Sequence, residues 1–298
     1  MEYAGKFLIE YPSRSDVIRL WSLADFHIWN RNCAIDRLKA DIATIAADTH
    51  AFAVGNGDYG DFITWSDKRF DAEAIAEHVT LVELSKIGSA LSEEIKSVLW
   101  PIKHKLIGLG FGNHEKKYMV QREHSDMHGA LCYKLGVPNF GLSARFDIVF
   151  QRNPRIAKPR LARGTPAARS GVGTSWTVRV YQHHGAGAAQ TPGGKVNRLV
   201  NFMHMVDADL YLIAHLHDET QKKLVRIDTD KNCTRAKERV TLGTITGTYL
   251  RTYQQGATGY GEIRGYAPTP LGAVVVEFEP DKQVMRMAME AVVQNDAD

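Results

Sequence analysis

Residues 17–27 read VIRLWSLADFH, an apolar run that ends at an aspartate and a histidine. The first part, Val17–Leu23, is rich in β-branched and aromatic residues, which favour strands. The polar cluster that follows contains Asp25 and His27, two residues apart. Side chains with this spacing at the end of a strand point to the same side. The stretch therefore predicts a strand that presents a carboxylate and an imidazole together.

The same arrangement occurs at four more places in the chain. Short apolar runs at 51–54, 105–109, 176–182 and 209–213 each end in a polar turn. These turns are Gly57-Asp58-Tyr59-Gly60-Asp61, Gly112-Asn113-His114-Glu115, His183-His184-Gly185 and His215-Leu216-His217. In layered α/β folds, ligands bind at the carboxyl ends of strands, where the loops converge. We therefore expect the five turns to gather at one site.

Helices are predicted between these strands, at about 31–47, 70–99, 115–134 and 196–206, and Gly88 is a candidate break in the second. Segments rich in strand-forming residues follow near 221–228, 239–246, 271–279 and 283–290. The alternation of strands and helices predicts an α/β sheet core, and the β-rich tail predicts a second sheet packed on it. We expect residues 1–298 to form a single α/β domain.

The composition is that of an ordinary globular protein, with 298 residues, 44% hydrophobic and 24% charged. No run of 18 apolar residues is present, which excludes a membrane-spanning helix. The N-terminus lacks a basic segment followed by an apolar one, so a secretory signal is not expected. Cys33, Cys132 and Cys233 form no CxxC pair, which disfavours a disulfide framework and a cysteine zinc site. We therefore expect a cytoplasmic protein.

The polar turns contain seven carboxylate, amide and imidazole donors. They are Asp25, His27, Asp58, Asn113, His183, His215 and His217. This mixture suits divalent manganese, iron, cobalt, nickel or zinc, and not calcium, which binds oxygen atoms. Seven donors are too many for one four-coordinate ion but fit two ions that share a carboxylate. Asp58 is the natural bridge because Gly57 before it allows close approach. Two divalent ions, two aspartates and a hydroxide leave a charge of about +1, which attracts a phosphate ester.

The order of the five turns resembles the calcineurin-like metallophosphoesterase superfamily. Its signature is D-x-H, G-D-x-x-D, G-N-H-(D/E), H and G-H-x-H, and all five blocks occur in order across residues 25–217. Ala214 stands where the family usually has glycine, which affects local geometry and removes no ligand. The resemblance implies a four-layer α/β/β/α sandwich of two mixed β-sheets flanked by helices. It also implies a binuclear metal-dependent hydrolase that cleaves phosphate monoesters or diesters with a metal-bridging hydroxide.

The resemblance implies a role for each matched residue. Asp25, His27, Asp58 and His217 would hold the first metal ion, and Asp58, Asn113, His183 and His215 the second. His114 would be catalytic, as a phosphate ligand and proton donor to the leaving oxygen. Asp61 would orient a metal ligand or His114, with an ordinary helix N-cap as the alternative. His183 is preferred to His184 because it directly ends the strand, and His184 is the alternative metal or substrate ligand.

A basic insertion separates two of the predicted strands. Residues 151–173 contain no acidic side chain and six basic ones, Arg152, Arg155, Lys158, Arg160, Arg163 and Arg169. Without them the chain has 31 basic residues (37 − 6) against 34 acidic ones. This Pro/Gly-rich loop is either an arm that binds a polyanion such as nucleic acid or a mobile, solvated insertion.

Other charged side chains give weaker signals. Lys195, Arg198 and Arg251 are candidate substrate contacts by charge alone. His124 and His128 lie four residues apart on a predicted helix, and no third ligand accompanies them. We therefore expect them on a solvated helix face.

The sequence leaves the substrate class open. Protein phosphatases of this superfamily continue the second block with Arg-Gly, whereas Asp61 is followed here by Phe62 and Ile63, which disfavours that branch. The basic loop favours a nuclease, and a small-molecule phosphodiesterase or phosphatase fits equally well. Residues 241–272, rich in Gly, Thr and Tyr, resemble segments of phage and prophage members. The alternative function is a non-catalytic module of the same fold that binds nucleic acid or protein.

Overall fold

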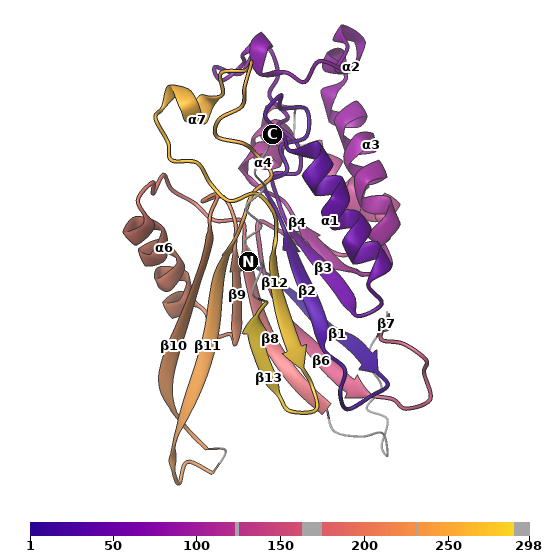
Figure 1. Ribbon diagram of the computed structural model, residues 1–298, viewed down its shortest axis with the longest axis vertical. Helices are drawn as coiled ribbons and strands as arrows, with labels where there is room; N and C mark the ends of the chain where they lie inside the picture. The colour runs from indigo at the N-terminus through magenta and orange to yellow at the C-terminus, as the bar shows by residue number, and fades with distance from the viewer. Residues whose placement is uncertain (123–124, 163–174, 231, 289–298) are drawn as a thin grey trace, which may run out of the picture.

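A computed structural model of the protein describes residues 1–122, 125–162, 175–230 and 232–288, whose strands form two sheets (Figure 1). The first sheet has the strand order β10-β11-β9-β8-β6-β1-β7 and the second the order β13-β12-β2-β3-β4-β5. The strands of the first sheet are β1 (Glu2–Tyr11), β6 (Ser143–Arg152), β7 (Arg160–Ala162), β8 (Ser175–His183), β9 (Leu210–Ile213), β10 (Glu219–Thr229) and β11 (Ala236–Thr246). Those of the second sheet are β2 (Ile18–Leu23), β3 (Ala51–Asn56), β4 (Leu106–Gly110), β5 (Asn139–Gly141), β12 (Val274–Glu279) and β13 (Val284–Met287).

Helices lie on the outer faces of both sheets and in the connections. They are α1 (Ile35–Ala47), α2 (Leu81–Ser85), α3 (Ile87–Leu99), α4 (Asn113–Gln121), α5 (Met127–Leu135), α6 (Pro192–Met205) and α7 (Tyr260–Ile263). Two short 3-10 helices, η1 (Ala72–Ala74) and η2 (Trp100–Ile102), complete the set among the described residues.

Apolar side chains fill the spaces between these layers. Leu20 and Phe52 of the second sheet pack between the sheets with Phe146 and Val180 of the first. The outer face of the second sheet packs against α1, α3 and α5, and that of the first sheet against α6. Figure 1 accordingly shows α6 on one side and α1 and α3 on the other. This order of layers confirms the predicted four-layer α/β/β/α sandwich.

Strand β3 illustrates how the sequence produces this layering. Ala51 and Ala53 face the helices, whereas Phe52 and Val54 face the other sheet. Successive side chains of a strand point to opposite faces, so small residues meet the helices and large ones fill the space between the sheets. Both faces are buried, and the strand therefore reads as a continuous apolar run.

The tail strands do not form a sheet of their own, so that prediction is wrong. β10 and β11 extend the first sheet beside β9, whereas β12 and β13 extend the second sheet beside β2. Strands β1, β5, β6 and β7 were not predicted at all. An apolar pattern identifies a strand and its buried faces, but the partner across each edge depends on hydrogen bonds between distant segments.

The predicted helices also divide differently. The break in 70–99 falls at Lys86, between α2 and α3, and Gly88 lies inside α3. A Cβ at Gly88 would lie 2.4 Å from the Tyr118 hydroxyl, so this glycine provides room for a packed ring. The predicted helix 115–134 is split into α4 and α5. His128 on α5 is fully buried, so the expected solvated face is wrong for it, and His124 lies outside the described residues.

The functional turns lie at one end of both sheets, the end near α4 in Figure 1. β2, β3 and β4 run parallel in the second sheet, and β8 and β9 run parallel in the first. The side-chain amide of Asn56, at the end of β3, donates to the backbone carbonyls of His183 (3.2 Å) and Leu212 (3.0 Å). The carboxyl ends of strands from two sheets are thereby tied together.

The described flanks of the basic loop lie at the other end of the first sheet. Ser143 pairs with His183 near the functional turns, and Gln151 pairs with Ser175 at the far end. At about 3.3 Å per residue, eight residues of β8 span about 26 Å. Arg152 and Arg160 have ion-pair partners in Asp281 (3.6 Å) and Glu10 (2.6 Å). Arg163 and Arg169 lie outside the described residues.

Within the described residues, the helices are too short or too polar to cross a membrane.

Candidate metal centre

Backbone hydrogen bonds connect the turns that follow β2, β3 and β9. The Asp25 amide donates to the Gly57 carbonyl (3.0 Å), and the His27 amide donates to the Asp58 carbonyl (3.1 Å). The His215 amide donates to Asp25 Oδ2 (2.9 Å). Residues up to 190 positions apart in the sequence therefore lie in direct contact.

One group of donors consists of Asp25, His27 and His217. Oδ1 of Asp25 lies 3.3 Å from Nε2 of His217 and 3.9 Å from Nε2 of His27, and the two Nε2 atoms are 3.4 Å apart. His27 Nδ1 donates to Asp61 Oδ1 (3.0 Å), which leaves the lone pair of His27 on Nε2. Asp25 Oδ1 is buried without a hydrogen-bond partner. A cation between these atoms would satisfy the orphaned oxygen.

The second group consists of Asp58, Asn113, His184 and His215. Asp58 Oδ2 lies 3.1 Å from His184 Nε2, and the Asn113 side-chain oxygen lies 3.1 Å from the same nitrogen. That oxygen is also 2.8 Å from His215 Nδ1 and 3.3 Å from Asp58 Oδ2. Ligand atoms about 2.1 Å from one ion lie about 3 Å from each other, so this spacing suits a coordination shell.

Tautomers decide what the second group can bind. His184 Nδ1 lies 2.8 Å from the Asn56 carbonyl and His215 Nε2 lies 3.0 Å from the Gly187 carbonyl. Carbonyl oxygens only accept, so these nitrogens carry protons, and in the neutral rings the inward nitrogens carry lone pairs. Burial lowers the pKa of His184, but Asp58 outweighs burial and raises this pKa to about 10, so without an ion the inward nitrogen of His184 also carries a proton. A cation that binds here displaces that proton. The Asn113 oxygen is a fourth ligand atom in its inward orientation, whereas turning the amide over would let its NH2 group donate to the three neighbours.

His183, the preferred ligand in the sequence, does not join this group. It shares a face of β8 with Tyr181, and its ring centroid lies 4.7 Å from that of Phe202 on α6. Its Nδ1 accepts from the Gly185 amide (2.7 Å). His184 takes the other face, with Val180, toward the second sheet. The structure therefore corrects the choice between the two neighbours: His184 faces the cluster.

Asp61 holds two histidines of the site. Its Oδ1 accepts from Nδ1 of His27 (3.0 Å) and lies 3.2 Å from Nδ1 of His114, which also faces the Asp61 carbonyl (2.7 Å). Its Oδ2 accepts from the side-chain amide of Asn30 (2.9 Å). Asp61 begins no helix, so it orients side chains and is not an N-cap.

The charges of the cluster shift each other's ionisation. Burial raises the pKa of Asp58, but His184 and His114 outweigh burial and hold that pKa well below its usual value. Burial lowers the pKa of His114, but Asp58 and Asp61 outweigh it and raise this pKa to about 9. The carboxylates are therefore ready to bind a cation at neutral pH.

The sequence did not assign a role to Glu115, although it closes the third block. Its buried carboxylate accepts from the amides of Asp58 (3.0 Å), Tyr59 (2.7 Å) and Gly112 (2.9 Å). Glu115 thereby joins the turns that follow β3 and β4. Burial and the Asp58 charge raise its pKa to about 7.

Backbone strain is concentrated in these turns. Asp25, His27, Asp58, His215 and His217 all have φ between 45° and 70°. This left-handed region is disfavoured for residues with a side chain, and such residues persist only when their surroundings fix them. Gly57 has φ of 92°, and a Cβ there would lie 2.3 Å from the Gly112 nitrogen. The turn after β3 therefore requires glycine.

Two of the three candidate substrate contacts, Lys195 and Arg198, lie on α6, and the third, Arg251, lies in the segment that follows β11. Lys195 Nζ pairs with Asp218 Oδ2 (3.2 Å) and lies 3.3 Å from the His217 carbonyl. Arg251 Nη1 lies 3.4 Å from the Cys33 carbonyl. Arg198 lies against Gly187, where an added Cβ would be 3.0 Å from its Nη2. These contacts connect the three side chains to neighbouring loops, and their contact with a substrate stays a prediction.

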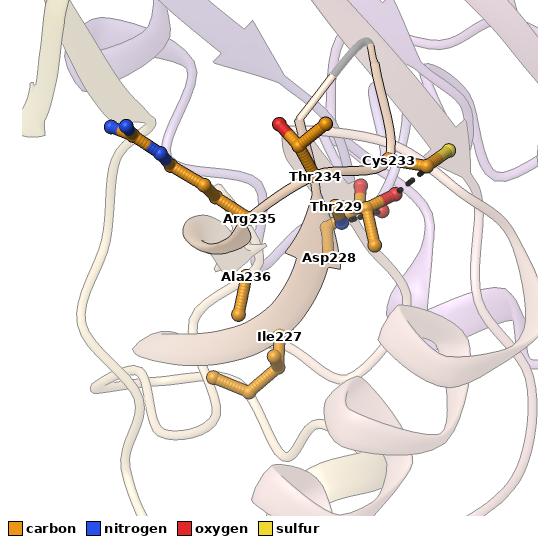
Figure 2. A pocket seen from close by; sticks show the side chains of 7 residues that line it. All are labelled: Ile227, Asp228, Thr229, Cys233, Thr234, Arg235 and Ala236. Carbon is orange, nitrogen blue, oxygen red and sulfur yellow. Dashed lines mark hydrogen bonds between the residues drawn. The ribbon is translucent and has the colours of Figure 1, made fainter.

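A separate hollow lies at the tip of the β10–β11 hairpin (Figure 2). It is lined by Ile227, Asp228, Thr229, Cys233, Thr234, Arg235 and Ala236. Figure 2 shows the hydrogen bond from the Thr229 hydroxyl to Cys233 Sγ, 3.8 Å. The hairpin leads away from His217 through the eleven residues of β10, so this hollow is remote from the cluster.

No family model and no curated protein matches the chain. Among solved structures, it is similar to a conserved uncharacterized protein from Streptococcus pneumoniae, described as a predicted phosphoesterase. The identity is 8%, the match covers 88% of this chain and 84% of that one, and the TM-score is 0.32. It is also similar to a Vps29 single mutant from Entamoeba histolytica, with 8% identity, 88% and 86% coverage and a TM-score of 0.33.

At these TM-scores the two likenesses carry no argument. The sandwich is established by the two sheets themselves, and the function must be inferred from the side chains of the cluster.

Proposed function

We propose that the protein is a metal-dependent phosphoesterase that binds two divalent ions among manganese, iron, zinc, nickel and cobalt. One observation carries the proposal: an inward atom of each of Asp58, His184 and His215 lies within 3.3 Å of the Asn113 side-chain oxygen, so that four potential ligand atoms converge on one position. The donor mixture is one that first-row metals prefer.

The proposed ligands fall into two sets. Asp25, His27 and His217 would hold the first ion and Asn113, His184 and His215 the second, with Asp58 as the proposed shared ligand. When bound, such ions supply a water of lowered pKa and positive charge for the phosphate oxygens. The two aspartates contribute only −2 against +4, so the loaded site attracts an anionic ester.

The side chains around the ions complete the proposed chemistry. His114 is fixed through Nδ1 by Asp61, which leaves its Nε2 to donate a proton to the leaving oxygen. Asp61 fixes His27 at the same time, so one carboxylate aligns a metal ligand with the acid. Glu115 holds the turn of Asp58 through backbone amides.

The basic loop at 151–173 remains a proposed contact for a nucleic-acid substrate, supported by its charge alone. Its described flanks lie about 26 Å from the cluster along β8. These flanks are therefore too far away to position a substrate phosphate at the metal ions themselves. We also propose a cytoplasmic location, because the three cysteines are free.

Elemental analysis and hydrolysis assays test the proposal. Protein purified with Mn²⁺ should contain about two metal ions per chain and hydrolyse p-nitrophenyl phosphate, bis-p-nitrophenyl phosphate or single-stranded DNA. Asp58→Asn should lose at least one ion and at least about 100-fold of the activity. If metal-loaded protein is inert on all three substrates, the phosphoesterase proposal is wrong. Binding of nucleic acid or protein without hydrolysis would then favour the non-catalytic module.

A further inference from the structure

Arg69 lies at the edge of the candidate metal centre, in the segment between β3 and α2. Its Nη1 is 3.4 Å from Nε2 of His114. The sequence motifs do not include this residue. Arg69 and Asp61 line the same pocket, whose other walls include the apolar side chains of Trp29, Phe62 and Phe70. Apolar walls strengthen the electrostatic interactions of a charge beside them.

Asp67 fixes the orientation of this guanidinium. Its Oδ1 accepts from Arg69 Nε (3.2 Å) and its Oδ2 accepts from Arg69 Nη2 (3.0 Å). The Arg69 backbone amide also donates to Asp67 Oδ1 (3.0 Å). A two-point pair of this kind fixes the plane of the guanidinium, and Nη1 is not needed for it.

The pairing leaves a surplus of positive charge. Asp67 has a side chain only 1% exposed, and it also pairs with Lys117 Nζ on α4 (2.7 Å). Two cations are therefore held by one carboxylate, so these three side chains together carry +1. The Asp61 carboxylate of the same pocket is paired with His27 and His114. An anion that approaches His114 therefore meets the Arg69 guanidinium in a fixed position.

The geometry beside His114 suits an oxygen atom. His114 Nδ1 is bound to Asp61, so Nε2 is the atom that would give a proton to a leaving group. Nη1 of Arg69 can only donate. During hydrolysis two donors would therefore be directed at one place, and an oxygen of the substrate phosphate satisfies both.

We propose that Arg69 binds a non-bridging oxygen of the substrate phosphate and makes the site selective for phosphate monoesters. A monoester is largely a dianion at neutral pH and has three non-bridging oxygens, whereas a diester is a monoanion with two. The fixed cation therefore stabilises the monoester more. This inference rests on the proposed phosphoesterase function and adds the class of substrate to it.

Matched esters test the inference with the Mn²⁺-loaded full chain. The test compares kcat/KM for p-nitrophenyl phosphate and bis-p-nitrophenyl phosphate, which share a leaving group, in wild type, Arg69→Gln, Arg69→Lys and Lys116→Gln. Arg69→Gln should lower the monoester value about 10- to 100-fold and the diester value less than about threefold. Arg69→Lys should recover part of the loss, and Lys116→Gln, at an exposed position of α4, should keep the wild-type ratio. Equal losses on both esters, or an unchanged ratio, would overturn the inference.

A binding measurement separates this inference from the proposed function. Inorganic phosphate should bind Mn²⁺-loaded wild type about tenfold or more tightly than Arg69→Gln in calorimetry. If wild type hydrolyses neither ester, the proposed function fails, and phosphate binding alone then decides the role of Arg69. An unchanged dissociation constant in Arg69→Gln refutes the contact. Arg69 is about one-third exposed, so the variant is expected to fold, and its unfolding temperature checks this.

Discussion

His183 and His184 are consecutive residues whose side chains occupy opposite faces of the first sheet. Only His184 directs a ring nitrogen, Nε2, at Asp58 and Asn113, because its Nδ1 faces the Asn56 carbonyl. His183 lies against Phe202. At the scale of single residues, the metal centre is thus defined by which ring faces inward and which nitrogen carries the proton.

The adjacent pair gives a matched test of this assignment. His184→Asn should lose one of two metal ions and at least about 100-fold of the phosphoesterase activity, because a metal ligand is removed. His183→Asn should keep both ions and most of the activity. Elemental analysis after purification with Mn²⁺ measures the difference. Loss of metal from the His183 variant alone would show that the assignment is reversed.

At the scale of elements, helix α5 buries an imidazole behind the metal-centre turns. His128 Nε2 lies 3.2 Å from the Leu109 carbonyl of β4, and its ring stacks on Tyr59 with an interplanar angle of 3°. Burial lowers the pKa of His128 from its ordinary 6.5 to about 4. The folded protein therefore keeps this ring neutral where the unfolded chain takes up a proton.

This depressed pKa predicts an acid-sensitive helix contact. Stability should fall as the pH drops from 6.5 toward 4, because only the unfolded chain binds the proton there, and the loss should end below 4. At pH 5 the free energy of unfolding should be about 2 kcal/mol lower than at neutral pH because of His128 alone. Urea unfolding of EDTA-treated wild type and His128→Leu at several pH values measures this loss. The free energy of unfolding should fall more steeply with decreasing pH in wild type than in the variant. The exposed residue His104 provides the control, since His104→Leu should keep the wild-type slope; equal slopes for all three proteins would contradict the prediction.

At the scale of the whole molecule, the cluster joins loops from both sheets. The left-handed backbones of Asp25, Asp58 and His215 cost free energy in the folded state. Ions that bind only the folded protein would offset this cost and shift the folding equilibrium.

Metal binding should therefore raise the unfolding temperature. Mn²⁺ at about 100 times its dissociation constant adds about 2.7 kcal/mol for each ion bound, which corresponds to roughly 4 °C per ion for a chain of this size. Thermal unfolding with Mn²⁺, with EDTA and with Ca²⁺ measures the effect. Ca²⁺ should have little influence, since imidazole ligands do not suit it. Asp58→Asn should respond to Mn²⁺ much less than wild type, and a wild type insensitive to EDTA would count against the centre.

Much of the fold and site could be predicted from local sequence. The apolar runs before Asp25, Asp58, Asn113 and His215 predicted the strands, because a strand buried on both faces is continuously apolar. The polar residues after each run predicted the turns. The division of the tail strands between two sheets could not be predicted, because edge pairing depends on segments that are distant in the chain.

The sequence by itself determined which residue types stand at the strand ends, and with them the ligand atoms available to a metal ion, since donor type is a property of each side chain. The tertiary structure alone decided between His183 and His184. Tyr181 on one face of β8 and Val180 on the other are both apolar and buried, so the local pattern does not reveal which face meets the other sheet. It also brought Arg69 to His114, 45 residues away in the chain, because Asp67 orients the guanidinium beside the start of α4.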